Sequence, residues 1–317
     1  MILKRVLAHA SRGRLSIMIF HRVVAEPDPL LPGEPSAEQF EALLRHVKSR
    51  FSVIPLAEGV RRLYDGTLPA GAMAITFDDG YADNLAVAAP ILGRLAIPAT
   101  VFIATGYLDG GCMFNDIVIE AIRATARREI DLASIGLGTL PLASIADRQS
   151  AIDRAITAIK YLPPGQRSEK TRDIVRAGGV AAPTGLMMSR DSVRLLGGYG
   201  IDVGAHTVTH PILANLPAAD AWREIRESRQ DLQQMLQKPV DLFAYPNGGP
   251  GHDYTGEHVR MVRETGFTAA VTTASGAASR SSDVLQLPRF TPWTRRPMKF
   301  DLLMLRNLRQ GSERQAA

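Results

Sequence analysis

The chain has 317 residues, of which 45% are hydrophobic and 22% are charged, so it can bury one large core and is neither a disordered nor a fibrous chain. Its single cysteine, Cys112, excludes an intrachain disulfide and a cysteine-rich zinc site. The formal net charge of +5 could favour an anionic membrane surface or a polyanionic substrate, although basic residues scattered over a solvated surface explain it more simply.

The first residues predict no export or membrane-spanning segment. Basic residues interrupt positions 1–14 too often for the apolar part of a secretory signal, and no run approaches the roughly 20 apolar residues that span a bilayer. We therefore expect a cytoplasmic protein that can touch the inner membrane face peripherally. No basic-aromatic motif predicts nucleic-acid binding, and no pattern indicates an oligomeric state.

Short β-rich runs alternate with helical patterns along the chain, which is typical of repeated β-α units. Seven such runs predict strands, and this number suggests an α/β barrel. They lie at residues 15–20, 51–54, 73–77, 99–103, 202–205, 241–245 and 268–272.

Several helix ends carry readable signals. Ser36 and Gln39 form a capping-box pattern ahead of an apolar helical face. Ser189 predicts the start of a helix that ends at Gly197 and Gly198. Gly266 predicts the end of a helix over residues 254–265, because a left-handed conformation is easiest for glycine.

The pattern changes to a long helical segment after the fourth predicted strand. Helices are predicted at 114–128 and 147–161, with turns at Gly136, Gly138 and the Pro163-Pro164 pair. We interpret residues 109–187 as a helical insertion, a lid or cover for the substrate cleft, within one domain spanning residues 1–310. Residues 311–317 are expected to form a disordered tail.

The strongest local motif is Thr76-Phe77-Asp78-Asp79-Gly80-Tyr81. An apolar run delivers two carboxylates to the end of a strand, and Gly80 allows a sharp turn. Active sites of β/α barrels collect at that end of the strands. The competing interpretation is an aspartate pair that caps a helix beginning near Asp83.

Two histidines also follow a predicted strand. His206 and His210 come after the fifth predicted strand, and two imidazoles with one carboxylate are a common ligand set for catalytic zinc. Histidines four positions apart are as often a coincidence on a helix face, but with the Asp78-Asp79 pair at another strand end we favour a metal site.

Three further strand ends carry polar groups. His21 follows the first strand, where it is either a catalyst or a rim residue. Residues 245–248 can offer the backbone N–H of Tyr245 or Asn247 to an oxyanion, or form a plain turn. Arg289 follows a short apolar run and can orient a carboxylate through a bidentate contact, or form a surface ion pair.

Taken together, these motifs resemble the polysaccharide deacetylases of carbohydrate esterase family 4, which share the NodB homology domain. The resemblance covers residues 15–108 and 186–292. It implies a distorted (β/α)7 barrel and metal-dependent removal of N-acetyl, or sometimes O-acetyl, groups from sugars. It also implies that Asp78 is the catalytic base and that Asp79, His206 and His210 bind the metal.

Two motifs differ from the common form of the family. The C-terminal Leu-X-His segment that supplies the general acid is missing, and the third motif lacks its arginine. Both differences resemble the circularly permuted exopolysaccharide deacetylases, where a Tyr-His segment on the first strand supplies the acid. Here that segment is Phe20-His21, and the resemblance implies that Arg289 takes the place of the missing arginine as the group that orients Asp78.

The resulting hypothesis is a hydrolase that releases acetate from an N-acetylated poly- or oligosaccharide or its precursor. Zn²⁺ is the expected metal, although Co²⁺ or Ni²⁺ suits the same ligands. An amidase acting on a small non-sugar C–N bond and a non-catalytic carbohydrate-binding barrel are the alternatives. Aromatic side chains are expected to stack on the sugar; the candidates are Tyr81, Tyr107, Phe114, Trp222, Tyr245 and Trp293.

Overall fold

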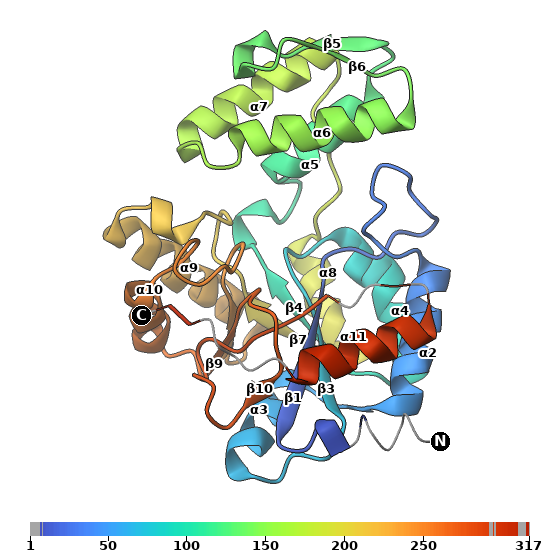
Figure 1. Ribbon diagram of the computed structural model, residues 1–317. Coiled ribbons are helices and arrows are strands. Elements are labelled where there is room, and N and C mark those ends of the chain that lie inside the picture. Colours follow the sequence, from blue (N-terminus) through green and yellow to red (C-terminus); the bar gives the residue numbers. More distant parts are fainter. Residues whose placement is uncertain (1–6, 8, 292–293, 295, 310–314, 317) are drawn as a thin grey trace. The chain divides into compact units, whose positions relative to one another are not determined.

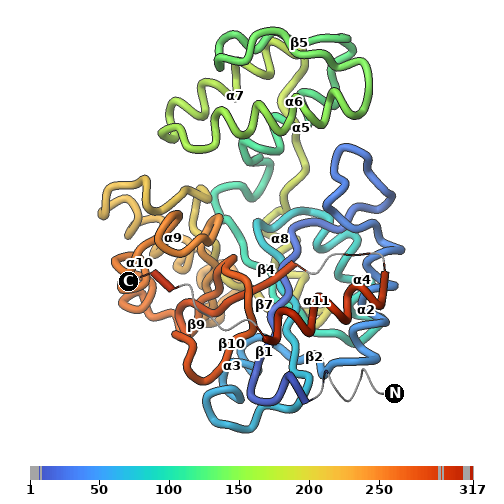
Figure 2. The backbone as a smooth tube through the Cα atoms, viewed as in Figure 1, coloured from blue at the N-terminus to red at the C-terminus, as the bar shows by residue number. Residues whose placement is uncertain are grey.

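The computed structural model describes residues 7, 9–291, 294, 296–309 and 315–316. Its main sheet has the strand order β10-β1-β3-β4-β7-β8-β9, with β2 also paired to β3 (Figures 1 and 2). Every pairing is parallel except that of β1 with β10. The strands are β1 (Arg14–Phe20), β2 (Ser52–Val53), β3 (Ala72–Phe77), β4 (Ala99–Ile103), β7 (Ile201–Ala205), β8 (Leu242–Ala244), β9 (Ala269–Val271) and β10 (Ala278–Ser279).

Residues 287–290 connect the two ends of this sheet. Leu287 forms a parallel bridge with Val271 of β9, and Phe290 forms one with Met18 of β1. The Phe290 N–H donates to Ile17 O at 3.1 Å. Each of the seven predicted strands is present, and the expected distorted α/β barrel is confirmed.

Alternation of side chains along the strands produces two separate cores. Leu15 and Ile17 of β1 share one cluster with Ala74 and Phe102 inside the barrel, whereas Met18 belongs to the cluster beneath the surrounding helices. Successive side chains of a strand point to opposite faces, and parallel sheets bury both. This arrangement explains the continuous apolar runs in the sequence.

Several helices of the described residues belong to the same compact unit as the barrel, which comprises residues 1–27, 33–108 and 188–317. α3 closes the end of the barrel where the strands begin, since Leu56 and Val60 pack in the interior cluster. The opposite end, where the strands finish, carries the polar motifs. The helices are α2 (Ala37–Arg50), α3 (Leu56–Asp65), α4 (Ala89–Leu95), α8 (Arg190–Leu195), α9 (Ala218–Leu236), α10 (Gly256–Thr265) and α11 (Pro297–Arg309).

Three predicted helix ends are confirmed and one is wrong. Ser36 and Gln39 form the capping box of α2, and Gly266 ends α10 with φ of 92°. Ser189 caps α8 as predicted, but that helix ends at Leu195. A 3₁₀ turn carries the chain through both predicted stop glycines to Gly200, which adopts the left-handed conformation.

Residues 28–32 and 109–187 form a second compact unit. It contains α5 (Phe114–Ala124), α6 (Ile145–Ile159), α7 (Pro164–Gly178) and a hairpin of β5 (Glu129–Asp131) and β6 (Thr139–Pro141). The helix predicted at 114–128 is shorter because the chain enters this hairpin. The proline pair read as a turn begins α7 instead, since proline suits a first helical turn.

Within the described residues, no helix combines the length and apolar character needed to cross a membrane. The predicted tail at 311–317 lies outside the described residues except for 315–316, where Ala316 donates its N–H to Gln286 Oε1 at 2.7 Å.

Candidate active site

Asp78 and Arg289 form a buried, bidentate ion pair at the end of β3. The two guanidinium nitrogens Nη1 and Nη2 donate to Asp78 Oδ1 and Oδ2, each at 2.7 Å. Arg289 is 0% exposed and also donates to Thr76 Oγ1 at 3.2 Å and to Thr272 O at 2.9 Å. Every contact fixes the plane of the guanidinium, so the carboxylate has one orientation.

A left-handed backbone at Asp79 directs this second carboxylate into the same site. Alternation along β3 would point adjacent side chains in opposite directions. Asp79 has φ of 77° and Gly80 has φ of 89°, and the Asp79 carbonyl accepts the Ala104 N–H at 3.2 Å. Such a φ is uncommon for a residue other than glycine and is found at functional sites.

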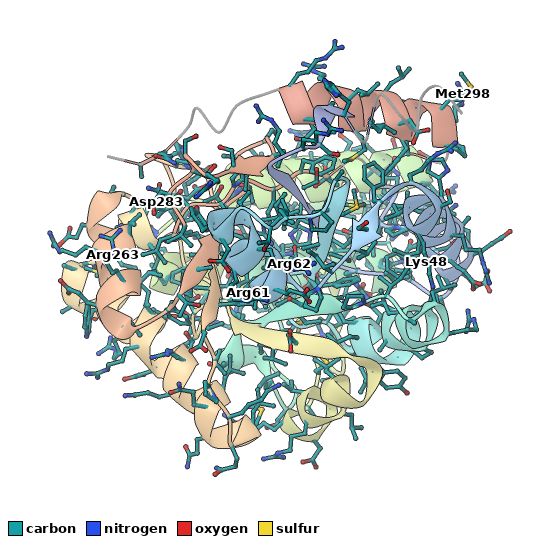
Figure 3. The ribbon with its side chains drawn as sticks, turned by 90° about the horizontal axis from the view of Figure 1, so that it is seen from below. Lys48, Arg61, Arg62, Arg263, Asp283 and Met298 are labelled. Atoms are coloured by element: carbon teal, nitrogen blue, oxygen red, sulfur yellow. The ribbon has the colours of Figure 1, made fainter. Side chains whose placement is uncertain are left out.

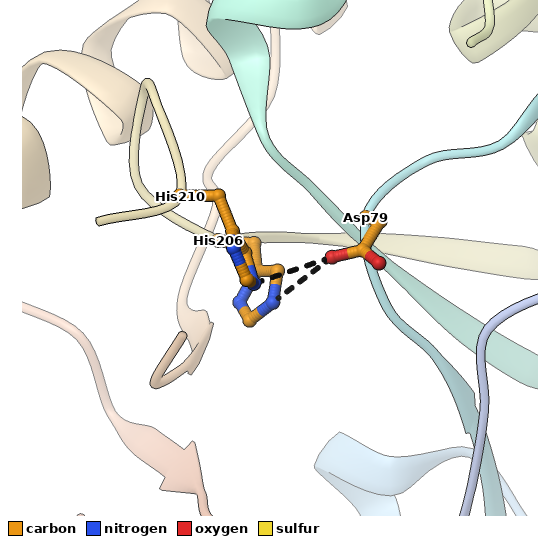
Figure 4. A group of neighbouring side chains, drawn as sticks. All are labelled: Asp79, His206 and His210. Atoms are coloured by element: carbon orange, nitrogen blue, oxygen red, sulfur yellow. Dashed lines mark ion pairs between the residues drawn. The ribbon is translucent and has the colours of Figure 1, made fainter. Parts of the chain in front are cut away.

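His206 and His210 face Asp79 (Figure 4). The Nε2 atoms of both histidines lie 3.4 Å from Asp79 Oδ1, and one ligand atom from each of the three residues lies within 4.8 Å of the others. Asp79 Oδ1 is buried and has no hydrogen-bond donor among the described residues. Two nitrogens converging on an orphaned carboxylate oxygen fit a divalent cation.

The backbone sets the tautomer of His206. Its Nδ1 lies 2.7 Å from Ala244 O of β8, so this nitrogen carries the proton and donates to the carbonyl. Nε2 is then left with its lone pair toward Asp79. Histidines that bind metals are commonly oriented by such a contact to their other nitrogen.

Charges around the site shift the pKa values of its members in opposite directions. Burial by itself would raise the pKa of Asp78, but Arg289 and then His206 hold it below its ordinary value. Burial also tends to raise the pKa of Asp79, but His210 and His206 lower it below its ordinary value. Burial lowers the pKa of His210 to about 4, whereas the two carboxylates raise that of His206 against burial. Both carboxylates are therefore ionised at neutral pH.

Glu224 of α9 holds the turn that carries the two histidines. Its Oε2 accepts the N–H groups of Val208 and Thr209, each at 2.8 Å, and its Oε1 accepts the Thr209 hydroxyl at 2.6 Å. Within the turn, Thr207 and His210 have φ of 64° and 51°. Glu224 was missed by the sequence analysis, since it lies 15 and 16 positions from its partners in the chain.

His21 lies exposed just beyond the end of β1. Its carbonyl accepts the buried Asn84 side-chain amide at 2.8 Å. Burial has the largest effect on the pKa values of Asp78 and Asp79 and raises them. Arg289 and the two other histidines lower them, and His21 contributes to the same lowering. Its ring is therefore within electrostatic range of Asp78 and Asp79 and is open to solvent.

The two backbone N–H groups predicted to bind an oxyanion differ in their hydrogen bonding. The Tyr245 N–H donates to Val271 O of β9 at 3.2 Å, because the sheet continues through this residue; its service to an oxyanion stays a prediction. The Tyr245 ring is buried against Tyr254. Asn247, with φ of 58°, has no acceptor for its N–H among the described residues.

The predicted stacking residues have different environments. Tyr81 is 3% exposed beneath the Arg22 guanidinium, so its ring offers no open face. Tyr107 is half-buried and donates its hydroxyl to Thr209 O at 2.8 Å, next to His210. Trp293 lies outside the described residues.

Comparisons with known proteins identify the family and the fold. The family described as Polysaccharide deacetylase matches residues 65–270. Among solved structures, Streptococcus pyogenes deacetylase PplD has a TM-score of 0.60 at 18% identity, covering 94% of this chain and 99% of its own. IcaB from Ammonifex degensii has a TM-score of 0.59 at 16% identity, covering 92% and 97%.

A de-N-acetylase from Aggregatibacter actinomycetemcomitans has a TM-score of 0.53 at 15% identity, covering 87% of this chain and 94% of its own. At these identities the solved structures establish a shared fold. The family match spans more than half of the sequence and includes Asp78, Asp79, His206 and His210. This protein therefore belongs to the polysaccharide deacetylase family and is a hydrolytic deacetylase.

Proposed function

We propose that the protein removes N-acetyl groups from amino sugars of a poly- or oligosaccharide or its precursor, with a divalent metal at Asp79, His206 and His210. One observation carries the proposal. Asp78 Oδ2, held by Arg289, lies 3.9 Å from His206 Nε2. A fixed carboxylate base thus stands directly beside a group of three metal ligands, as hydrolysis by an activated water requires.

The residues present fit such a cation, as the orphaned Asp79 oxygen and the two converging nitrogens indicate. Zn²⁺ suits this ligand set, and Co²⁺ or Ni²⁺ is accepted by it. When bound, the metal supplies Lewis-acid activation of water and of the acetyl carbonyl.

Asp78 accepts the proton of the attacking water. Its lowered pKa keeps it ionised, and the bidentate contact with Arg289 leaves it no other orientation. The Asn247 N–H is the backbone donor available for the developing oxyanion, since that of Tyr245 is engaged in the sheet.

His21 donates a proton to the sugar nitrogen as the C–N bond breaks. An amine is too basic to leave as an anion, so the reaction needs an acid as well as a base. The ring of His21 is exposed and lies within electrostatic range of Asp78. The products are acetate and a free amino sugar. PplD, which shares the fold, was solved in complex with acetate.

Acetate release from N-acetylglucosamine oligomers by zinc-loaded protein tests the proposal. We expect His21→Ala to retain metal and to lose about 10²- to 10⁴-fold in turnover. Asp79→Ala should lose the metal itself. His9→Ala, which removes another exposed histidine, is the matched control and should behave as the wild type.

Each failure has a distinct meaning. If the protein binds metal but releases acetate only from small non-sugar amides, its substrate is a small amide and not an N-acetylated sugar. Absence of bound metal after loading with zinc, cobalt and nickel would indicate a barrel that binds carbohydrate without the chemistry. Wild-type turnover in His21→Ala would remove this residue from the mechanism.

A further inference from the structure

The C-terminal helix α11 has one face anchored in the barrel unit. Phe300, Met304 and Leu308 are buried in the cluster beneath the helices. Asp301 is also buried, and its carboxylate lies 2.8 Å from His46 Nε2 and 3.6 Å from Arg50 Nε of α2. These contacts hold the helix firmly and determine which face is left outside.

The outer face of α11 carries an apolar stripe. Met298 is 76% exposed and Leu302 is 60% exposed, and half-buried Leu305 follows three positions later. Positions i, i+4 and i+7 lie on one side of a helix. Met298 is the most exposed large hydrophobic side chain among the described residues, and Figure 3 shows it at the outer edge of the molecule.

The exposed charges of α11 itself have one sign. Lys299, Arg306 and Arg309 are exposed on α11, and Arg296 is exposed just before it. In the described part of the chain, none of these four residues is in an ion pair. The only acidic residue of the helix is Asp301, whose charge is buried and paired with α2. The outer face therefore combines apolar and cationic groups.

We propose that α11 docks this protein on the surface of an anionic lipid bilayer. Exposed methionine and leucine side chains insert at the boundary of headgroups and acyl chains, while the neighbouring cations contact anionic headgroups. A soluble polyanion would use the cations but leave the apolar stripe in water. A second copy of the helix would bring like charges together.

Co-sedimentation with lipid vesicles tests the proposal. Wild-type protein should bind vesicles of equal parts phosphatidylglycerol and phosphatidylcholine at least roughly tenfold more tightly than vesicles of phosphatidylcholine alone, at about 0.1 M NaCl. We expect Met298→Ser with Leu302→Ser to lose most binding. Lys299→Glu with Arg306→Glu should weaken it by at least roughly tenfold.

Matched controls stand elsewhere on the same unit. Leu195→Ser alters a leucine that is also 60% exposed, on α8. Arg61→Glu with Arg62→Glu reverses two charges on α3, which Figure 3 also labels. Both controls should bind within about twofold of the wild type, because they leave α11 unchanged.

Four results would overturn the proposal: no binding of the wild type to anionic vesicles, wild-type binding by both α11 variants, equal loss in the controls, or binding only to a soluble polyanion such as polygalacturonate. Thermal melting checks that the variants fold, and the charge variant still tests the helix if the apolar one unfolds. Acetate release from soluble oligomers should be unchanged, so this result is independent of the catalytic proposal.

Discussion

The pair formed by Asp78 and Arg289 is the most constrained contact of the site. Both side chains are almost fully buried, and two charges removed from water need good geometry and further hydrogen bonds to be tolerated. Thr76 Oγ1 and Thr272 O provide those additional partners for Arg289. The pair therefore serves the orientation of the base more than it serves stability.

Replacing Arg289 by methionine should destabilise the protein by about 3–5 kcal/mol, because a buried carboxylate is left without its counterion. Turnover should also fall, since Asp78 then binds a proton more readily and loses its fixed orientation. Urea unfolding and acetate release measure the two effects.

The companion variants separate charge from geometry. Arg289→Lys keeps a cation without the bidentate contact, so it should recover stability more than turnover. Adding Asp78→Asn to Arg289→Met should restore part of the lost stability. A loss below about 1 kcal/mol in Arg289→Met would contradict the assigned role of the pair.

At the scale of elements, α9 stabilises the turn between His206 and His210 through Glu224. Removing Glu224 by substitution with alanine breaks three hydrogen bonds to Val208 and Thr209. We expect metal affinity to fall about 10- to 100-fold, as is usual for residues that position ligands. Chelator competition measures the dissociation constant directly.

Glu227→Ala is the control, since Glu227 is exposed on the same helix. It should leave the metal affinity unchanged. Glu224→Gln retains one acceptor oxygen, so its metal affinity should lie between those of Glu224→Ala and Glu227→Ala. Equal metal affinity in Glu224→Ala and the wild type would show that the turn keeps its conformation without this helix.

The close packing of β4 against β7 requires glycine at position 204. A Cβ atom at Gly204 would lie 2.5 Å from the Phe102 ring and 3.0 Å from Leu242 O. Gly204→Ala should therefore destabilise the protein by about 1–3 kcal/mol. Metal affinity should fall as well, because His206 follows two residues later.

Gly198→Ala provides the comparison, since nothing lies within 4 Å of a Cβ atom built there. Its free energy of unfolding should remain within about 0.5 kcal/mol of that of the wild type. Similar urea midpoints for both variants would mean that Phe102 moves aside without strain.

For the whole molecule, the buried Tyr245 and Tyr254 and the half-buried Tyr64 predict a loss of stability in alkali. Burial, followed by Asp283, raises the pKa of Tyr64 to about 12 and also raises that of Tyr254; burial and Tyr254 raise that of Tyr245. Unfolded tyrosine ionises near pH 10, so above this pH the unfolded state binds fewer protons and the free energy of unfolding falls.

Absorbance at 295 nm, followed together with circular dichroism, checks this expectation. Tyr64, Tyr245 and Tyr254 should ionise chiefly as the protein unfolds, and Tyr254→Phe should make the alkaline loss of stability less steep. Ionisation of all seven tyrosines near pH 10, with native circular dichroism, would contradict it.

The parts of this structure that could be predicted are those with local causes. Strands buried on both faces give uninterrupted apolar runs, so all seven runs were recognisable, and Ser36 and Gly266 mark helix ends through neighbouring atoms. The existence of α7 was missed, because a proline pair signals either a turn or a first helical turn.

The site was predictable only in part, for a related reason. Asp78, Asp79, His206 and His210 occur in short motifs at strand ends. The contacts of Glu224 and the engagement of the Tyr245 N–H depend on which strands and helices become neighbours. No local pattern predicts those pairings, so the sequence left Tyr245 and Asn247 as alternative oxyanion donors and did not show that the Tyr245 N–H also bonds to β9.

The separation of Asp78 and Arg289 by 211 positions also has a consequence during biosynthesis. A ribosome adding about 5–20 residues per second needs roughly 10–40 s to reach the arginine after the aspartate. Until then, closing β1, β3 and β4 around Asp78 would bury a carboxylate without its counterion. We therefore expect the barrel to close around Asp78 only after Arg289 has emerged, and a chain truncated before residue 289 to leave this carboxylate without its partner.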